Sequence, residues 1–597
     1  MAMLDQNHWL HSGEPQDEML EPLSIGHWVS RFQGKMPHRL GSLLTTLLSI
    51  EGLAEFSFDI DGRHYEGRAD LNAQLELEIK STLSHHDLRE RIMFAWACLR
   101  CQHLLLQSKA LSGQDFSNAE AASATDVYFA VDAPNSVSQA VEDAGKQLVF
   151  LSDHFQNVDP LDFWVHCQNS GRVIDASQCL AKLFVYPPQK LKGPRSSLKL
   201  LVVGSHQIWD GLTNYVWFRN FVHLLNKSIP ELRKRIRELL DPSSILKRLP
   251  PPQEALYPPI EGSRARQRWF WLLTRILRHI RKPLQQGFVN PLRRKHRYTR
   301  AVPLSPIYKP LLDYSKIPPL NSIPCFAKAS LKGTKRLHRI CREANASVGA
   351  GCFALAALLM MELYERREPG IPLSERLPFI SGFPLNPRAF FNHASEPDSL
   401  MLAFCDGIML PFLPSHLDLD GRLRLLAKQA HRQLMVFQKR PNIQRDKGGV
   451  EYMGSRGPGR LLQMQYISSL ERTQAMLPEH LRSGLNPQGA YPMRPNHSTQ
   501  TCGVSSVGRR EALIKPGYYD LDEEDEAFIA DFRSSFASVR PREGEFLVGV
   551  GGSDEGLWVN ASVDGSTNDP ALVEEWRKRF ERVLDEGGGM ETRDYKL

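Results

Sequence analysis

Residues 198–211 read L-K-L-L-V-V-G-S-H-Q-I-W-D-G and hold the strongest structural signal in the chain. The apolar run 198–204 predicts a buried strand, and the residues that follow Gly211 predict a helix over about 212–226. Asp210 stands where a helix N-cap is expected. His206 therefore lies between a strand end and a helix start, where rigid elements can hold its ring toward a cleft. The residues alone leave two readings open, a general base or a polar cap at the end of a strand.

The flanking sequence extends this unit in both directions. Residues 178–186 predict a second strand, and the polar connection P-P-Q-K-L-K-G-P-R-S-S predicts a hairpin with 198–204. Farther on, C-F-A-K-A-S-L at 325–331 predicts a strand, followed by two helices with N-A-S at 345–347 as the cap of the second. The chain closes with two strands, a D-G turn and a helix. Strands and helices alternate in both halves, which is typical of a pair of α/β layered domains.

Length and composition narrow the class of protein. At 597 residues the chain predicts two domains, and 42% hydrophobic with 24% charged residues is typical of a globular protein. The net charge of +7 is modest, so we expect no nucleic-acid partner. Nine cysteines without a spaced framework indicate reduced thiols and a cytoplasmic location. Cys98 and Cys101 form a C-x-x-C inside a helical apolar pattern, which favours core thiols over a metal or redox site.

No membrane segment is expected. The N-terminus lacks a basic start followed by an apolar block, so it does not resemble a signal peptide. The longest apolar run, C-F-A-L-A-A-L-L-M-M at 352–361, is about half a membrane crossing and predicts a buried core helix.

The segment 231–300 is basic and Pro-rich, and within it 264–282 predicts an amphipathic helix. Trp269, Ile276 and Ile280 fall on its apolar face, and Arg275 and Arg278 on its basic face. Two interpretations remain open. The helix contacts a membrane surface or an acidic carrier protein, or it packs on the domain with a solvated basic face. The Pro-rich residues 303–324 then predict a linker that crosses between domains.

The string H-x-x-x-D-G occurs a second time, at His416 to Gly421. No uninterrupted strand leads into His416, and Asp418 or Asp420 suits the N-cap of a helix that begins near Gly421. We therefore expect His416 to be a loop residue. Sequence context, rather than the string itself, separates the two copies.

In the catalytic interpretation, His206 takes a proton from a hydroxyl or amine as it attacks an acyl carbonyl. Gly211 would let the backbone approach closely at the turn. The sequence lacks G-x-S-x-G after a strand, H-E-x-x-H, and a P-loop, so neither a serine hydrolase nor a metal site is predicted.

The stretch S-H-Q-I-W-D-G, with its strand and helix, resembles the H-x-x-x-D-G motif of the acyl-CoA-dependent acyltransferase superfamily. Plant BAHD enzymes, fungal alcohol and trichothecene O-acetyltransferases, and condensation domains belong to that group. Further segments are similar to it in order: residues 326–360, F-P-L-N-P-R-A-F-F at 383–391, C-G-V-S-S-V-G-R at 502–509, and the closing strand, turn, strand, D-G and helix. Together they cover most of the chain from about 180 to 584.

The resemblance implies an α/β fold of two chloramphenicol-acetyltransferase-like subdomains with a tunnel between them. They would span 1–302, with the basic insertion at about 231–300, and 325–597, joined by the linker 303–324. It implies His206 as general base, Asp210 and Gly211 as structural support, and Arg388 as the ion-pair partner of Asp210. Ser505 or Ser506 would hold the thioester or oxyanion, unless they only pack in their strand. No metal or bound cofactor is implied, and acyl-CoA is a co-substrate.

The sequence departs from that pattern at two points. Ser205 stands where many members have a second His, and the D-F-G-W-G motif of plant members is absent, so the fungal acetyltransferases are the better likeness. The function implied is transfer of an acyl group, acetyl in the first instance, from coenzyme A to a hydroxyl of a small secondary metabolite. Two alternatives remain: a condensation-type enzyme with a carrier-bound donor, and a non-acylating binding protein or cyclase with the same fold.

Overall fold

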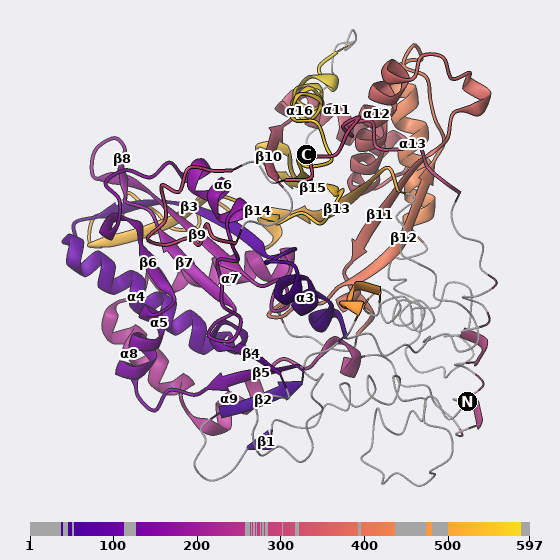
Figure 1. The fold of residues 1–597 in the computed structure, drawn as a ribbon. Coiled ribbons are helices and arrows are strands. Elements are labelled where there is room, and N and C mark those ends of the chain that lie inside the picture. The colour runs from indigo at the N-terminus through magenta and orange to yellow at the C-terminus, as the bar shows by residue number, and fades with distance from the viewer. Residues whose placement is uncertain are drawn as a thin grey trace.

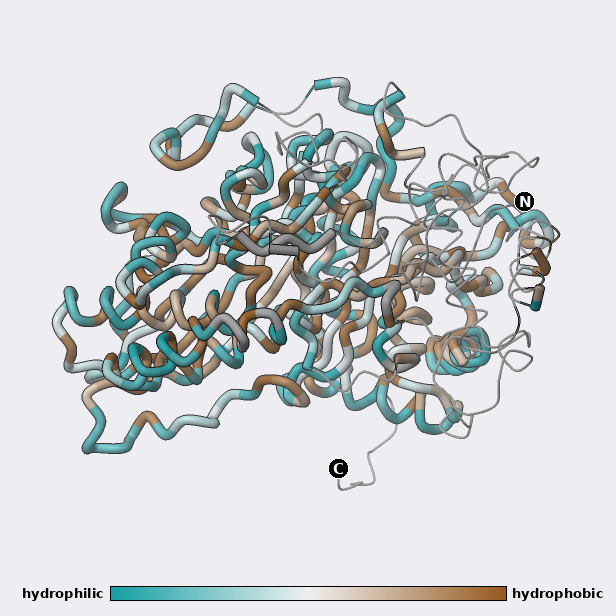
Figure 2. Tube along the Cα trace, turned by 90° about the horizontal axis from the view of Figure 1, so that it is seen from below, coloured by the Kyte–Doolittle hydropathy of each residue, from teal (hydrophilic) through white to brown (hydrophobic). Residues whose placement is uncertain are grey.

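A computed structural model describes residues 38–39, 46–50, 53–112, 127–256, 285–300, 303–316, 321–391, 396–435 and 500–586, with scattered positions in 263–280 and 473–479. These residues form two lobes, each built on a large sheet (Figure 1). Hydrophilic stretches lie mostly along the outer helices and loops, and hydrophobic ones lie in the interior (Figure 2). The predicted α/β class is confirmed.

The first sheet has the strand order β14-β3-β9-β7-β6, with β8 beside β9. Its central strand, β9 (Arg195–Gly204), is antiparallel to β3 (Leu71–Ser81) and β7 (Ala181–Val185). β6 (Leu148–Phe150) is parallel to β7, and β8 (Gln189–Lys190) lies in the hairpin connection. The hairpin expected between 178–186 and 198–204 is therefore present.

Helices cover one face of this sheet and bury its aliphatic side chains. α4 (His85–Gln102) packs on α5 (Val137–Gly145), α7 (Gly211–Leu225) and α8 (Ile229–Leu239). The predicted stripe of α7 is buried in the resulting core, and it consists of Trp217, Phe218, Phe221, Val222 and Leu225. Cys98 and Cys101 are buried on α4, and desolvation raises their thiol pKa to about 12 and about 11. Both residues are core thiols, as expected.

The other face of the sheet is covered by α6 (Pro160–Asn169) and by part of the crossover segment. Tyr308 and Leu312, within the predicted linker 303–324, are buried against α6. The Tyr308 hydroxyl donates to the Asp162 carboxylate at 2.7 Å. Residues 303–316 of this connection are thus held against the first lobe, whereas 322–324 already belong to a strand of the second large sheet.

A smaller four-stranded sheet has the order β1-β2-β5-β4. Its strands are β1 (His38–Arg39), β2 (Thr46–Ile50), β5 (Val127–Asp132) and β4 (Lys109–Ser112). α3 (Leu53–His64) follows β2, and α9 (Pro242–Arg248) lies near this sheet (Figure 1). Short 3-10 turns lie at Leu104–Gln107, Leu151–Asp153, Gln253–Leu256, Leu373–Glu375, Pro387–Phe390 and Arg510–Ala512.

The second large sheet has the order β10-β16-β15-β13-β11-β12. The strands are β10 (Ser322–Lys328), β16 (Gly556–Asp564), β15 (Phe546–Ser553), β13 (Cys502–Arg509), β11 (Phe379–Leu385) and β12 (Ala403–Leu410). The helices packed on it are α11 (Leu331–Glu343), α12 (Val348–Arg367), α13 (Leu419–Leu434) and α16 (Pro570–Val583). Ser347 caps α12, as predicted from N-A-S.

Among the described residues, α12 is the helix long and apolar enough to cross a membrane by length and composition. About 78% of its apolar window is buried inside the protein, where it fills the core of the second lobe. The helix therefore has the environment expected for a core helix.

One strand of the C-terminal half belongs to the sheet of the first lobe. β14 (Phe528–Val539) pairs along its whole length with β3 and forms an edge of the first sheet, although it lies within the range 325–597. It appears as an orange arrow among the indigo and magenta elements of the first lobe (Figure 1). The chain then returns to the second sheet through β15 and β16. The C-terminal half therefore contributes one strand to the sheet of the first subdomain. The boundary predicted at 303–324 did not anticipate this.

The predicted helix at 264–282 lies largely outside the described residues. Of its described side chains, Trp269, Ile276 and Ile280 are exposed.

Candidate functional site

His206 follows the last residues of β9, where the central strand of the first sheet ends. Its ring stacks on that of Phe58 from α3, with centroids 4.1 Å apart and planes 16° apart. The ring is partly accessible as a whole, but Nδ1 is buried and has no hydrogen-bond partner among the described residues. Desolvation lowers the His206 pKa to about 4, against the opposing effects of nearby backbone groups and Asp210. The imidazole is therefore neutral at ordinary pH and able to accept a proton.

Asp210 caps α7, as its position predicted. Its Oδ1 accepts hydrogen bonds from the backbone N–H groups of Leu212 and Thr213, both at 3.0 Å, and from the Thr213 hydroxyl at 3.1 Å. Its Oδ2 accepts from Arg388 at 2.7 Å and from the backbone of Met401 at 3.1 Å. These five donors occupy both carboxylate oxygens, so Asp210 joins the first lobe to a loop of the second.

Arg388 lies in the 3-10 turn after β11 and forms the ion pair that was expected with Asp210. Its Nη2 also donates to the Ser399 carbonyl at 2.5 Å, and the Thr213 hydroxyl lies 2.9 Å from the same carbonyl oxygen, so its single proton is shared between that oxygen and Asp210 Oδ1. The two side chains are only 14% and 8% exposed, for Arg388 and Asp210 respectively. Since charge-assisted bonds are strong when shielded from water, this contact orients the two lobes at the end of α7.

Ser205 occupies the position at which many members of the resembled superfamily have a second His. Its hydroxyl accepts from Arg172 Nη2 at 3.3 Å and donates to Gln207 Oε1 at 3.0 Å. Arg172 in turn pairs with the buried Asp70, at 2.8 and 3.0 Å. Ser205 is therefore fully buried within a polar network behind His206, where its small side chain leaves room for the Arg172 guanidinium.

Gly211 and β13 bring the second lobe against the start of α7. A Cβ at Gly211 would lie 2.7 Å from Cγ1 of Val507, which is less than van der Waals contact. The strand is irregular between Ser506 and Gly508, so the alternation of side chains can be followed only as far as Ser506. Ser506 shares its face of β13 with the buried core residue Val504, and that face approaches α12, since a Cβ at Gly349 would meet the Ser506 hydroxyl at 3.9 Å. Ser505 lies on the opposite face, and no hydrogen bond joins either serine to His206 in the described part of the chain.

We predict that Gly211→Ala destabilises the protein by about 1–3 kcal/mol, because the new methyl group overpacks against Val507. Gly349→Ala is the matched control, since its methyl group would meet nothing closer than 3.9 Å and alanine favours a helix. Urea unfolding followed by circular dichroism measures both. An unchanged midpoint for Gly211→Ala would show that the two lobes do not press together here.

An apolar cluster lines the site beside His206. Phe58, Ala69 and Leu400 are buried together, and the partly buried Ala54, Leu402 and Phe404 pack against them. The Phe58 and Phe404 ring centroids lie 6.3 Å apart. Because α3 belongs to the first lobe and 400–404 to the second, the cluster spans both lobes next to the imidazole.

The second H-x-x-x-D-G string has no such surroundings. His416 is exposed in a turn, and Asp418 caps α13 by accepting from the backbone of Gly421 at 2.7 Å. The prediction that His416 is a loop residue is confirmed.

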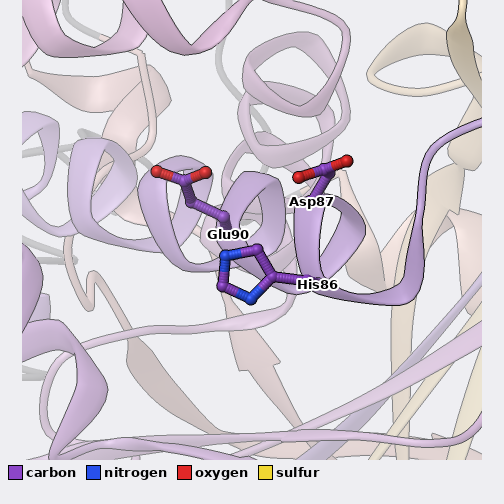
Figure 3. Close-up of side chains that lie close together, drawn as sticks. All are labelled: His86, Asp87 and Glu90. Carbon is purple, nitrogen blue, oxygen red and sulfur yellow. The ribbon is translucent and has the colours of Figure 1, made fainter.

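One group of metal-ligand side chains is present in the described chain, at the start of α4: His86, Asp87 and Glu90 (Figure 3). Asp87 accepts from the Ser84 hydroxyl at 2.8 Å, and Glu90 lies 3.5 Å from Arg233. These partners account for both acidic residues as helix-capping and surface charges, and the group lies apart from His206.

Sequence reasoning missed Phe58, Arg172 and also Arg542, whose charge lowers the His206 pKa. Phe58 and Arg172 carry no motif, and Phe58 reaches His206 across 148 positions of sequence. Only the pairing of strands and the packing of α3 bring them together.

No protein-family model matches the sequence, and no curated protein matches it by sequence. Among solved structures, the chain is similar to the TRI3 trichothecene 15-O-acetyltransferase of Fusarium sporotrichioides, with 12% identity, a TM-score of 0.60, and coverage of 91% of this chain and 98% of that one. A condensation domain of the polyketide synthase MokA also matches, with 12% identity and a TM-score of 0.47 over 90% of this chain and 96% of that one. The acetyltransferase match shows a shared fold and confirms the two sheet-containing subdomains that the resemblance implied.

Proposed function

We propose that this chain, which shares its fold with an O-acetyltransferase, transfers an acyl group from acyl-CoA to a hydroxyl of a small secondary metabolite. The observation that carries the proposal is the environment of His206. A neutral, partly accessible imidazole stands at a strand end, where elements of both lobes meet. That is the protonation state a general base needs.

In this mechanism Nε2 of His206 takes the proton of the acceptor hydroxyl, because Nδ1 is the buried nitrogen. The acceptor oxygen attacks the thioester carbonyl and forms a tetrahedral oxyanion. The carbon–sulfur bond then breaks, and the protonated His206 returns the proton to the departing CoA thiolate. Ser505, on the face of β13 away from α12, would donate to the oxyanion. Asp210 keeps α7 in place and takes no proton.

Release of CoA from acetyl-CoA tests the proposal directly. All nine cysteines are buried, so a thiol reagent will report the released CoA above a low protein background. We expect release to increase when a panel of small apolar alcohols is added, with acetylated products detected by mass spectrometry. If the acetyl group is transferred only from an acetylated carrier protein, the carrier protein and not CoA is the donor. If it is transferred from neither donor, acyl transfer is contradicted.

The pH profile follows from the His206 pKa of about 4. Because the base works when deprotonated, kcat/KM is expected to fall only as the pH drops through about 4. It should be level from about 5 to 7, where an ordinary histidine with pKa near 6.5 would already be losing activity. Steady-state rates in overlapping buffers measure this fall of kcat/KM at low pH, the acid limb of the profile. A midpoint near 6.5 would contradict a desolvated His206 as the base.

A further inference from the structure

Side-chain hydrogen bonds do not explain the orientation of the His206 ring. Histidines that act as bases are usually held by a partner on the second ring nitrogen. No described side chain bonds to Nδ1, and the carboxylate of Asp210 is occupied by five other donors. The backbone groups of His206 and Trp209 favour the charged ring, but they belong to its own turn. The contacts that other elements make with the ring therefore matter for its position.

Phe58 is the side chain that contacts the face of the imidazole. The interplanar angle of 16° and centroid distance of 4.1 Å place the two rings face to face, and Phe58 is only 3% exposed. Leu400 and Phe404 pack behind it from the second lobe. Phe58 therefore cannot turn away without opening a gap in a packed cluster.

The helix that carries Phe58 is itself anchored beside the site. Asp61, one turn later on α3, accepts two hydrogen bonds from Arg542 at 2.9 and 2.6 Å, and its side chain is buried. The Arg542 guanidinium also lies 5.5 Å from the centroid of the Phe58 ring. An ion pair between the buried Asp61 carboxylate and the half-buried Arg542 thus links α3 to the connection between β14 and β15.

We propose that Phe58 is a positioning residue for His206, holding the imidazole flat and offering its π face to the imidazolium that forms when the base takes a proton. The inference rests on the proposed function. A flat aromatic platform replaces the missing hydrogen bond on Nδ1, and cation–π attraction strengthens when the cation is desolvated. Asp210 at the start of α7 raises the His206 pKa and Arg542 lowers it, and the Arg542 guanidinium lies 5.5 Å from the centroid of the Phe58 ring.

Two substitutions distinguish the stacking of the Phe58 ring on the imidazole from the shielding of His206 from water. Phe58→Leu keeps an apolar side chain over His206, so we expect kcat to fall about tenfold while the acid limb stays near its original pH. Phe58→Ala uncovers the ring, so we expect a similar or larger fall in kcat and an acid limb that moves up toward the ordinary histidine value near 6.5. KM for acetyl-CoA should change little in both variants.

Phe56→Ala is the matched control, because Phe56 lies on the same helix but packs into the core of the first lobe. It should lower the urea midpoint and leave kcat and the acid limb unchanged. If the Phe58 variants behave like Phe56→Ala, Phe58 is only a packing residue and the inference is wrong.

A readout without turnover keeps this test separate from the proposed function. In protein labelled with 13C-histidine, the signal that disappears in His206→Ala identifies His206, and its titration gives the pKa directly. We expect that pKa to rise in Phe58→Ala and to stay unchanged in Phe56→Ala, whether or not acetyl-CoA is a donor. An unchanged titration in Phe58→Ala would overturn the inference even if acyl transfer is confirmed.

Discussion

His206→Ala is expected to lower kcat for CoA release about 10³-fold, with little change in KM for acetyl-CoA. The loss corresponds to removing a general base, whose contribution is typically 10²–10⁴-fold. Binding should survive, because Asp210 rather than His206 holds the two lobes together at this site. Stopped-time assays of CoA release and of acetylated product measure the effect.

His416→Ala is the control for this substitution, since His416 belongs to the second copy of the same string and is exposed in a turn. Its activity should equal that of the unaltered protein. Equal activities of all three proteins would rule out His206 as the base, and a loss confined to His416→Ala would assign the chemistry to the other copy.

Arg388→Ala is expected to destabilise the protein by about 3–5 kcal/mol, because it leaves the Asp210 carboxylate charged and shielded from water without its cationic partner. The same change removes the donor that reaches the Ser399 carbonyl. Activity should fall as well, since the end of α7 and the loop 396–401 would separate. Arg388→Lys keeps the positive charge but loses the planar pair of donors. Its stability should therefore lie between those of the unaltered protein and Arg388→Ala.

Arg219 provides a matched comparison, because it joins the same helix to the same loop. Its bond to Glu396 has the same 2.7 Å length as the Arg388–Asp210 pair, but these side chains are 37% and 63% exposed. An exposed pair contributes about 0–1 kcal/mol, so Arg219→Ala should shift the urea midpoint only slightly. Equal shifts for Arg219→Ala and Arg388→Ala would show that shielding does not strengthen the Asp210 pair.

The local structure around 198–226 was predictable because its signals are short-range. A continuous apolar run marked β9, and Asp210 and Ser347 marked helix starts through their side-chain chemistry. The same reasoning separated His206 from His416, since only one of them follows a strand. The ion pair of Arg388 with Asp210 came from the resemblance, because no local rule links residues 178 positions apart.

The remaining part of the site depends on packing between distant segments. Ser505 could be separated from Ser506 only after the register of β13 and the approach of Ser506 to α12 were known. Phe58 and Arg542 are ordinary residues in unremarkable sequence, and their positions follow from where α3 and the β14–β15 connection lie. Neither position is encoded in a spacing that could be read along the chain.

The pairing of β14 with β3 in the first sheet has a consequence for how the protein folds during synthesis. During synthesis, β3 is complete after residue 81 and β9 after residue 204, but the strand that covers the outer edge of β3 emerges only with residues 528–539. Until then the growing chain carries an open strand edge of eleven residues, which is a template for pairing with other chains. Closure of the first sheet must therefore wait until nearly the whole polypeptide has been made.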